Sequence, residues 1–249
     1  MEQLNTQFVL GNRYRCHERI GGGGMGDVYR AYDDHLGIQV AIKLLRTTDT
    51  TSEESLKDEV RKARNLNHPN IASAFNYEID TDTRRPFMVM ELIDGISLYE
   101  LLEQRNALPL NHTIRMAMQM ADALDYAHRE GVIHCDVQPK NVLLQGVRSI
   151  NDIDTQPLKI RLIDFGIAKA RPDSATQSAG LGVPAYVAPE RLRREPVESP
   201  VDIYSLGVLV FRMLTGQLPF ILRLRDENDS FTSLDSFTSL PERVCTAMQ

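Results

Sequence analysis

Five glycines and a lysine near the start of the chain have the types and spacing expected of a phosphate-binding site. The run Gly21-Gly22-Gly23-Gly24-Met25-Gly26 is followed seventeen residues later by Lys43, which ends the apolar run Val40-Ala41-Ile42. Because glycine has no Cβ, a hairpin built from it lets backbone N–H groups approach phosphate oxygens closely. A lysine on the adjoining strand adds a positive charge to the same phosphates. A glycine run alone also occurs in dinucleotide-binding folds, so the position of Lys43 is the more specific signal.

Three further motifs carry acidic and amide side chains suited to phosphoryl transfer. They are His134-Cys135-Asp136 with Asn141, then Asp164-Phe165-Gly166, then Ala188-Pro189-Glu190. In this order, after a glycine run and a lysine, they form the signature set of protein kinases. The chain resembles the eukaryotic-type (Hanks-type) Ser/Thr protein kinases, and its local sequence is most similar to the bacterial members. The resemblance extends from about residue 14 to residue 220.

The resemblance implies an α+β, two-lobed protein-kinase-like fold, with a β-rich N-terminal lobe and a mainly helical C-terminal lobe. We expect the first lobe to occupy residues 1–94 and the second to occupy residues 95–222. Residues 223–249 are polar and repeat Ser-Phe-Thr-Ser-Leu at 230–234 and 236–240, so we expect an incomplete lobe end or a polar tail there. The C-terminal lobe is therefore expected to be shortened relative to the family.

The same resemblance assigns the main chemical roles. Lys43 is expected to hold the α- and β-phosphates of ATP and to pair with Glu59, which stands beside the apolar stripe of a helix. Asp136 is the expected catalytic base, which accepts the proton of the substrate hydroxyl. Asn141 and Asp164 offer the oxygen ligands that Mg²⁺ requires.

A nucleotide base needs an apolar slot with backbone hydrogen-bonding groups at one edge. By resemblance, the residues expected around the nucleotide are Ile20, Gly21, Gly22, Gly23, Gly24, Met25, Gly26, Val28, Ala41, Lys43, Met90, Glu91, Ile93 and Leu143. Val28 and Ala41 would cover the adenine ring, and Leu143 would lie below it. Met90 stands at the gatekeeper position, just before the hinge.

Three substitutions depart from the pattern of the family. Cys135 replaces the arginine that pairs with a phosphorylated activation loop, which predicts activity that depends little on phosphorylation there. Gln138 replaces the lysine that touches the γ-phosphate, and Val183 stands where a threonine usually bridges the aspartate and that lysine. Loss of one charged hydrogen bond, ~1.5–3 kcal/mol, would slow transfer roughly 10- to 150-fold without abolishing it.

These observations predict an ATP-dependent Ser/Thr protein kinase whose activity is reduced by Gln138, Val183 and the short C-terminal lobe. Two alternatives remain, a nucleotide-binding pseudokinase scaffold and, with less support, a small-molecule phosphotransferase. The segment 182–190 argues against the latter, because it resembles the shelf on which kinases bind peptide substrates. The partners would be protein substrates, and self-phosphorylation would fall on Ser174, Thr176 or Ser178.

Hydrophobic patterning supplies the elements that position these residues. Strands are expected at 14–20, 28–32, 39–44, 87–92, 142–144 and 160–163. Helices are expected at 51–67, 98–104, 111–131 and 203–214. In the third helix, capped by Asn111, the shared buried face is expected to hold Ile114, Ala117, Ala121 and Leu124. The polar segment 145–159 is expected to be an exposed excursion, and His134 and Phe165 are expected to pack rather than react.

Composition narrows the class of protein. At 249 residues, 42% hydrophobic and 25% charged, the chain reads as an ordinary globular protein. A net charge of −6 argues against a nucleic-acid surface. There is no apolar stretch long enough to span a membrane and no secretory leader pattern, so no membrane segment is expected. Three cysteines without metal-ligand spacing fit a reducing, cytoplasmic setting.

Overall fold

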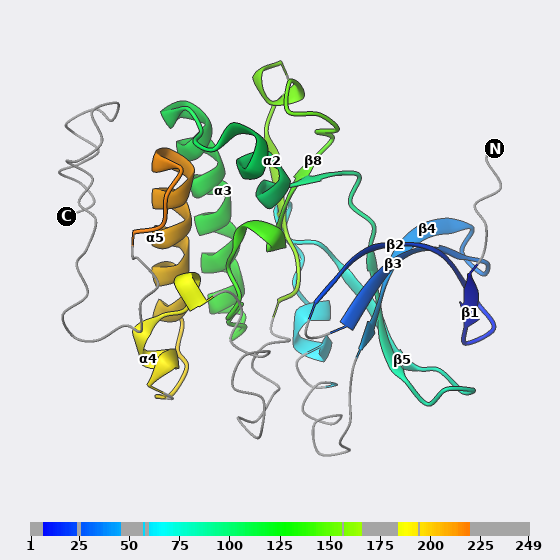
Figure 1. The fold of residues 1–249 in the computed structure, drawn as a ribbon. Helices are drawn as coiled ribbons and strands as arrows, with labels where there is room; N and C mark the ends of the chain where they lie inside the picture. Colours follow the sequence, from blue (N-terminus) through cyan, green and yellow to red (C-terminus); the bar gives the residue numbers. More distant parts are fainter. Residues whose placement is uncertain are drawn as a thin grey trace.

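The chain folds into two lobes, as the sequence predicts. The structure is a computed structural model that describes residues 7–23, 26–45, 57, 60–155, 157–165, 184–193 and 195–219. In Figure 1 the strands of the first part gather on one side of the molecule, and helices α2, α3 and α5 gather on the other. The proposed division between residues 94 and 95 falls between strands β6 and β7 and stays a prediction.

The N-terminal lobe is built on a six-stranded sheet with the order β1-β2-β3-β4-β6-β5. Its strands are β1 (Phe8–Leu10), β2 (Tyr14–Gly23), β3 (Gly26–Asp33), β4 (Ile38–Leu45), β5 (Ala74–Ile79) and β6 (Pro86–Glu91). Every neighbouring pair is antiparallel. The four strands predicted here are confirmed, whereas β1 and β5 were not predicted. Residues 60–64 are helical and bury Val60 and Ala63.

Alternation along β4 divides the sheet into two faces. Val40, Ile42 and Leu44 belong to one buried cluster, and Ala41 belongs to a second cluster on the opposite face. Successive side chains of a strand point to opposite faces, so Lys43 shares the face of Ala41. That second face turns toward the C-terminal lobe and carries Met88 and Met90 from β6.

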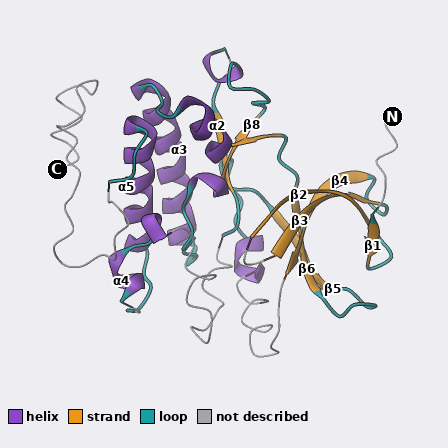
Figure 2. Ribbon diagram, viewed as in Figure 1, coloured by secondary structure: helices purple, strands orange, loops and turns teal. Residues whose placement is uncertain are grey.

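The C-terminal lobe combines a small sheet with helices. Strands β7 (Gly95–Ser97), β8 (Val142–Gln145) and β9 (Lys159–Leu162) form an antiparallel sheet, and the helices of this lobe are α2 (Leu98–Arg105), α3 (Leu110–Arg129), α4 (Pro189–Leu192) and α5 (Pro200–Thr215). Short 3-10 turns occur at η1 (Pro139–Asn141), η2 (Asp152–Asp154) and η3 (Pro184–Tyr186). Ser97 and Glu100 form a capping box that fixes the start of α2. Figure 2 shows α3 and α5 side by side, with Met120, Leu124 and Leu209 in the shared core.

The predicted face of α3 was wrong except for Leu124, which is buried. Ile114 is 47% exposed, and the buried residues of the helix are His112, Thr113, Met116, Met120, Ala123, Leu124 and Ala127. The helix also begins after Pro109, so Asn111 lies within it instead of capping it. The physical reason is that apolar residues occur around most of the circumference of this helix, so their spacing does not define a single face.

The prediction for residues 145–159 also needs correction. Val147 and Ile153 are fully buried and Leu158 nearly so, and all three join the core of the C-terminal lobe. Asp152 accepts hydrogen bonds from the backbone N–H groups of Arg148 and Ser149, which closes a tight turn over these apolar residues. The segment is polar on average because mainly polar residues separate Val147, Ile153 and Leu158 in the sequence.

Among the described residues, no helix has both the length and the apolar content needed to cross a bilayer.

Two methionines of α3 give a matched test of the packing. Met120 is fully buried, whereas Met118 is 67% exposed. We expect Met120→Ala to lower the free energy of unfolding by about 2–5 kcal/mol, because it removes buried atoms and leaves a cavity. Met118→Ala should change it by less than about 0.5 kcal/mol. Urea unfolding followed by circular dichroism measures both, and equal effects would show that α3 is packed in a different rotation.

Candidate active site

The described glycines of the run lie at the end of β2 and the start of β3. Gly21 pairs with Val28 and Gly23 pairs with Gly26, while Gly24 and Met25 lie outside the described residues. Gly26 has φ +153°, and a Cβ there would lie 2.3 Å from the carbonyl oxygen of Leu44. Only glycine therefore allows β3 to approach β4 this closely near the tip of the β2–β3 hairpin. Ile20, which precedes the run, is 43% exposed.

Lys43 is buried on the face of the sheet that turns toward the C-terminal lobe. It lies directly opposite Val28 on β3 and Met88 on β6, so the three side chains share this face. Its Nζ atom lies 2.7 Å from Oδ2 of Asp164, and only 4% of its side chain is exposed. Glu59, the predicted partner of Lys43, lies outside the described residues, so that pairing stays a prediction.

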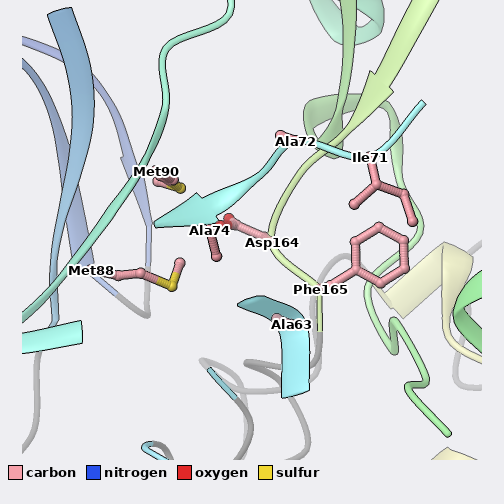
Figure 3. A pocket seen from close by; sticks show the side chains of 8 residues that line it. All are labelled: Ala63, Ile71, Ala72, Ala74, Met88, Met90, Asp164 and Phe165. Atoms are coloured by element: carbon pink, nitrogen blue, oxygen red, sulfur yellow. The ribbon is translucent and has the colours of Figure 1, made fainter. Parts of the chain in front are cut away.

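Asp164 brings a carboxylate from the end of β9 to this lysine. Its φ of +67° is rare for a residue other than glycine, and such backbone strain occurs preferentially at functional sites. Asp164 lines a small cavity of about 20 Å³ that it shares with Met88, Met90 and Phe165 (Figure 3). Its Oδ1 atom is buried and has no hydrogen-bond partner among the described residues.

The free oxygen of Asp164 and the amide of Asn141 fit a magnesium site. Asn141 donates through Nδ2 to the backbone oxygen and to Oδ2 of Asp136, both at 2.8 Å, which leaves its carbonyl oxygen for a cation. No group of three or more His, Cys, Asp or Glu in the described part of the chain could hold a metal alone. Mg²⁺ commonly takes one or two protein oxygens together with substrate phosphates, and the oxygens of Asn141 and Asp164 could supply these.

The carboxylate of Asp136 is held by two neutral amides. Gln138 donates from Nε2 to Oδ1 at 2.7 Å, and Asn141 donates from Nδ2 to Oδ2 at 2.8 Å. Asp136 itself is half-buried, whereas Gln138 and Asn141 are buried. The three residues therefore form one hydrogen-bonded unit within the loop that follows α3.

This loop is anchored by Asp202, a residue that the sequence analysis missed. Asp202 is fully buried in the first turn of α5 and accepts hydrogen bonds from the backbone N–H groups of His134 and Cys135, each at 2.8 Å. His128 Nε2 lies 2.8 Å from the same carboxylate. An acidic residue at the start of a mainly apolar helix was the available signal, but the predicted helix began at residue 203 and so excluded Asp202.

The packing role predicted for His134 and Phe165 is confirmed. Their ring centroids are 4.4 Å apart, and both residues are buried. The Nδ1 atom of His134 accepts a hydrogen bond from the backbone of Asp136. His134 therefore supports the loop and is not placed as a general base.

The expected adenine residues converge from both lobes. Ala41 and Met90 are directly paired across β4 and β6, and both are buried. Glu91 ends β6, Ile93 follows in the connection to β7, and Leu143 projects from β8. These residues come from the N-terminal sheet, the C-terminal sheet and the connection between them. Their enclosure of one adenine slot stays a prediction.

Cys135, the residue before Asp136, is buried and has φ +67°. Its carbonyl oxygen accepts a hydrogen bond from Arg191 of α4. Val183, Ser174, Thr176 and Ser178 lie outside the described residues, so their predicted roles stay predictions.

Comparison with known proteins places this geometry in a family. The family model described as "Protein kinase domain" matches residues 14–242. A probable serine/threonine-protein kinase of Streptomyces coelicolor is 37% identical over 85% of this chain and 31% of its own length. The serine/threonine-protein kinase PknA of Mycobacterium tuberculosis is 35% identical over 85% of this chain and 49% of its own length. The chain therefore spans about a third to a half of these relatives.

The fold agrees with a solved structure. The kinase domain of PknI from Mycobacterium tuberculosis superposes with a TM-score of 0.73 and 26% identity, covering 94% of this chain and 84% of that domain. The chain belongs to the protein kinase family, and within it to the bacterial Hanks-type Ser/Thr kinases.

Proposed function

We propose that this chain is an ATP-dependent protein kinase that transfers the γ-phosphate of ATP to Ser/Thr hydroxyls of protein substrates. The observation that carries the proposal is the unit of Asp136, Gln138 and Asn141, which holds one carboxylate in place with neutral donors. Neither contact neutralises the charge of Asp136. Each carboxylate oxygen has a second lone pair, so Asp136 can still accept the proton of an incoming hydroxyl.

The nucleotide would bind between the two lobes. Backbone N–H groups of residues 21–26 would contact its phosphates, and Lys43 would add a positive charge to the α- and β-phosphates. Val28, Ala41 and Leu143 would enclose adenine, with Met90 behind it. The backbone of Glu91 and Ile93 would then supply the hydrogen bonds at the edge of the ring.

Asn141 and Asp164 would hold Mg²⁺ through side-chain oxygens. When bound, Mg²⁺ neutralises charge that develops on the phosphate oxygens. The buried Oδ1 of Asp164 supports this assignment, because a carboxylate oxygen without a partner is costly unless a cation or water meets it. Lys43 already occupies Oδ2 of the same carboxylate, so Asp164 would join the lysine and the metal.

Protein substrates with Ser or Thr acceptors are supported by the names of the relatives. The 3-10 turn η3 and the start of helix α4 lie within the segment 182–190 that resembles a peptide shelf, which argues against a small-molecule substrate. Self-phosphorylation at Ser174, Thr176 or Ser178 is part of the proposal. So is a cytoplasmic location, with which the absence of a disulfide at Cys16 and Cys135 agrees.

The first test is transfer from labelled ATP with Mg²⁺ to a generic protein substrate, followed by phosphoamino-acid analysis. We expect label on Ser and Thr, and a loss of at least about a hundredfold in rate for Asp136→Asn, because general-base catalysis contributes about 10²–10⁴-fold. No transfer by the folded wild-type chain, with ATP binding retained, would favour the pseudokinase alternative.

The second prediction concerns Gln138. We expect Gln138→Lys to raise kcat about tenfold or more and to change the KM for ATP less, because a cation acts mainly on charge developed in the transition state. Gln138→Met, which removes the donor to Asp136, should lower kcat. Steady-state kinetics at varied ATP concentration measures both parameters. An unchanged or lower kcat in a folded Gln138→Lys variant would show that the site depends on glutamine itself.

The third prediction concerns the buried anchor of the loop. Asp202→Asn replaces one accepting oxygen with an NH₂ group that faces N–H donors. We expect the free energy of unfolding to fall by about 1–3 kcal/mol for each unsatisfied donor. We also expect kcat to fall, because the loop that carries Asp136 loses its support.

The matched control for this variant is Asp122→Asn on α3. Asp122 also lies beside a histidine, His68, but 68% of its side chain is exposed. Its loss should cost less than about 1 kcal/mol and leave kcat unchanged. Chemical denaturation and initial rates are measured on both proteins, and equal stability and kcat in the two variants would remove the anchoring role of Asp202.

A further inference from the structure

A buried arginine on β9 takes no part in the site described above. Arg161 is only 8% exposed, although its guanidinium always carries a positive charge. It forms an ion pair with Glu91 through Nη2, and its Nη1 atom donates to the backbone oxygen of Pro69 at 3.3 Å. A buried charge requires partners of this kind, so the contacts explain how Arg161 is tolerated. They do not explain why a cation is needed there.

The position of Arg161 links two walls of the proposed adenine slot. Arg161 lies directly opposite Leu143 in the antiparallel register of β8 and β9, so both side chains project from the same face of that sheet. Leu143 is the proposed floor of the slot. Glu91, at the other end of the ion pair, is the residue whose backbone is proposed to contact the edge of adenine. The guanidinium therefore connects β9, which is paired with the strand that carries Leu143, to the hinge residue Glu91.

A third segment, residues 69–73, is hydrogen-bonded both to Glu91 and to β9. The side chain of Glu91 accepts a hydrogen bond from the backbone N–H of Ser73 at 3.1 Å, and the backbone N–H of Glu91 donates to the Ser73 oxygen at 2.9 Å. The segment before Ser73 is in turn bonded to β9, because Leu162 donates to Asn70 and Ala72 donates to Leu162. The side chain of Asn70 also donates to the backbone oxygen of Ile160.

Arg161 and Glu91 thus span a ring of three segments, comprising residues 69–73, the end of β6, and β9. Residues 69–73 are joined by backbone hydrogen bonds both to β9 and to the end of β6. The hinge is joined to the floor by the Arg161–Glu91 pair, and to residue 73 by the contacts of Glu91. The ion pair is the contact that fixes the separation between hinge and floor directly.

We propose that Arg161 is a positioning residue for the nucleotide, which sets the width of the adenine slot by holding Glu91 against β9, the strand paired with the one that carries Leu143. The proposal rests on the proposed function. A slot held at the correct width before ATP arrives loses less conformational freedom on binding, so the pair should act on nucleotide affinity rather than on transfer. A lysine has a single nitrogen and would replace the forked contact with Glu91 and Pro69 only in part.

The test separates nucleotide affinity from catalysis in the full chain. Arg161→Met keeps side-chain length and removes the charge, and we expect it to raise the KM for ATP about tenfold, as the loss of about one charged hydrogen bond predicts. The kcat at saturating ATP should stay within about threefold of wild type, since the catalytic loop is untouched. Arg161→Lys should restore part of the affinity.

Two companion variants exclude a general loss of stability. Arg161→Met combined with Glu91→Gln removes both charges, and it should recover thermal stability while keeping the raised KM. Arg13→Met breaks a comparable pair with Asp33, whose side chain is 2% exposed, at the far edge of the N-terminal sheet. It should lower the melting temperature and leave the KM for ATP unchanged.

The proposal is overturned if Arg161→Met raises the KM no more than Arg13→Met does, or if kcat falls while the KM stays constant. Recovery of wild-type KM in the double variant would also overturn it, because the effect would then come from the unpaired carboxylate. A folded wild-type chain that neither binds nor turns over ATP overturns the proposed function and this proposal together.

Discussion

The ion pair between Lys43 and Asp164 joins the two lobes of this protein. Lys43 belongs to the central part of the N-terminal sheet, and Asp164 follows the last strand of the C-terminal sheet. Because the ammonium is almost completely buried, removing its carboxylate partner would cost about 3–5 kcal/mol. The two sheets are therefore fixed relative to each other at the point where phosphates are proposed to bind.

The rest of the site is organised by other buried polar groups, one on α5 and two in the loop that follows α3. Asp202 at the start of α5 holds the backbone of the loop that carries Asp136. Gln138 and Asn141 then orient the carboxylate of Asp136 from within the loop. Apolar packing of α3 against α5 supplies the rigid base beneath this loop, so the hydrophobic core and the polar network depend on each other.

Motifs and strand patterns were predictable from the sequence because they depend on residues close together in the chain. The glycine run, Lys43, and the alternation of β4 follow from local spacing. The roles of Asp202 and Arg161 were missed because their partners lie 67 and 70 residues away in the sequence. The buried face of α3 was misjudged because its apolar residues surround the helix, and the core then selects the face that sequence spacing leaves undecided.

The central claim is that Lys43 and Asp164 together bind the phosphates and Mg²⁺ of ATP. Titration calorimetry of Mg·ATP into the wild-type chain, Lys43→Met and Asp164→Asn tests it directly, with thermal unfolding as the check that each variant is folded. The account predicts binding to wild type and affinity reduced about tenfold or more in each variant, as expected when a charged contact is lost. Equal heats from the three folded proteins would contradict it.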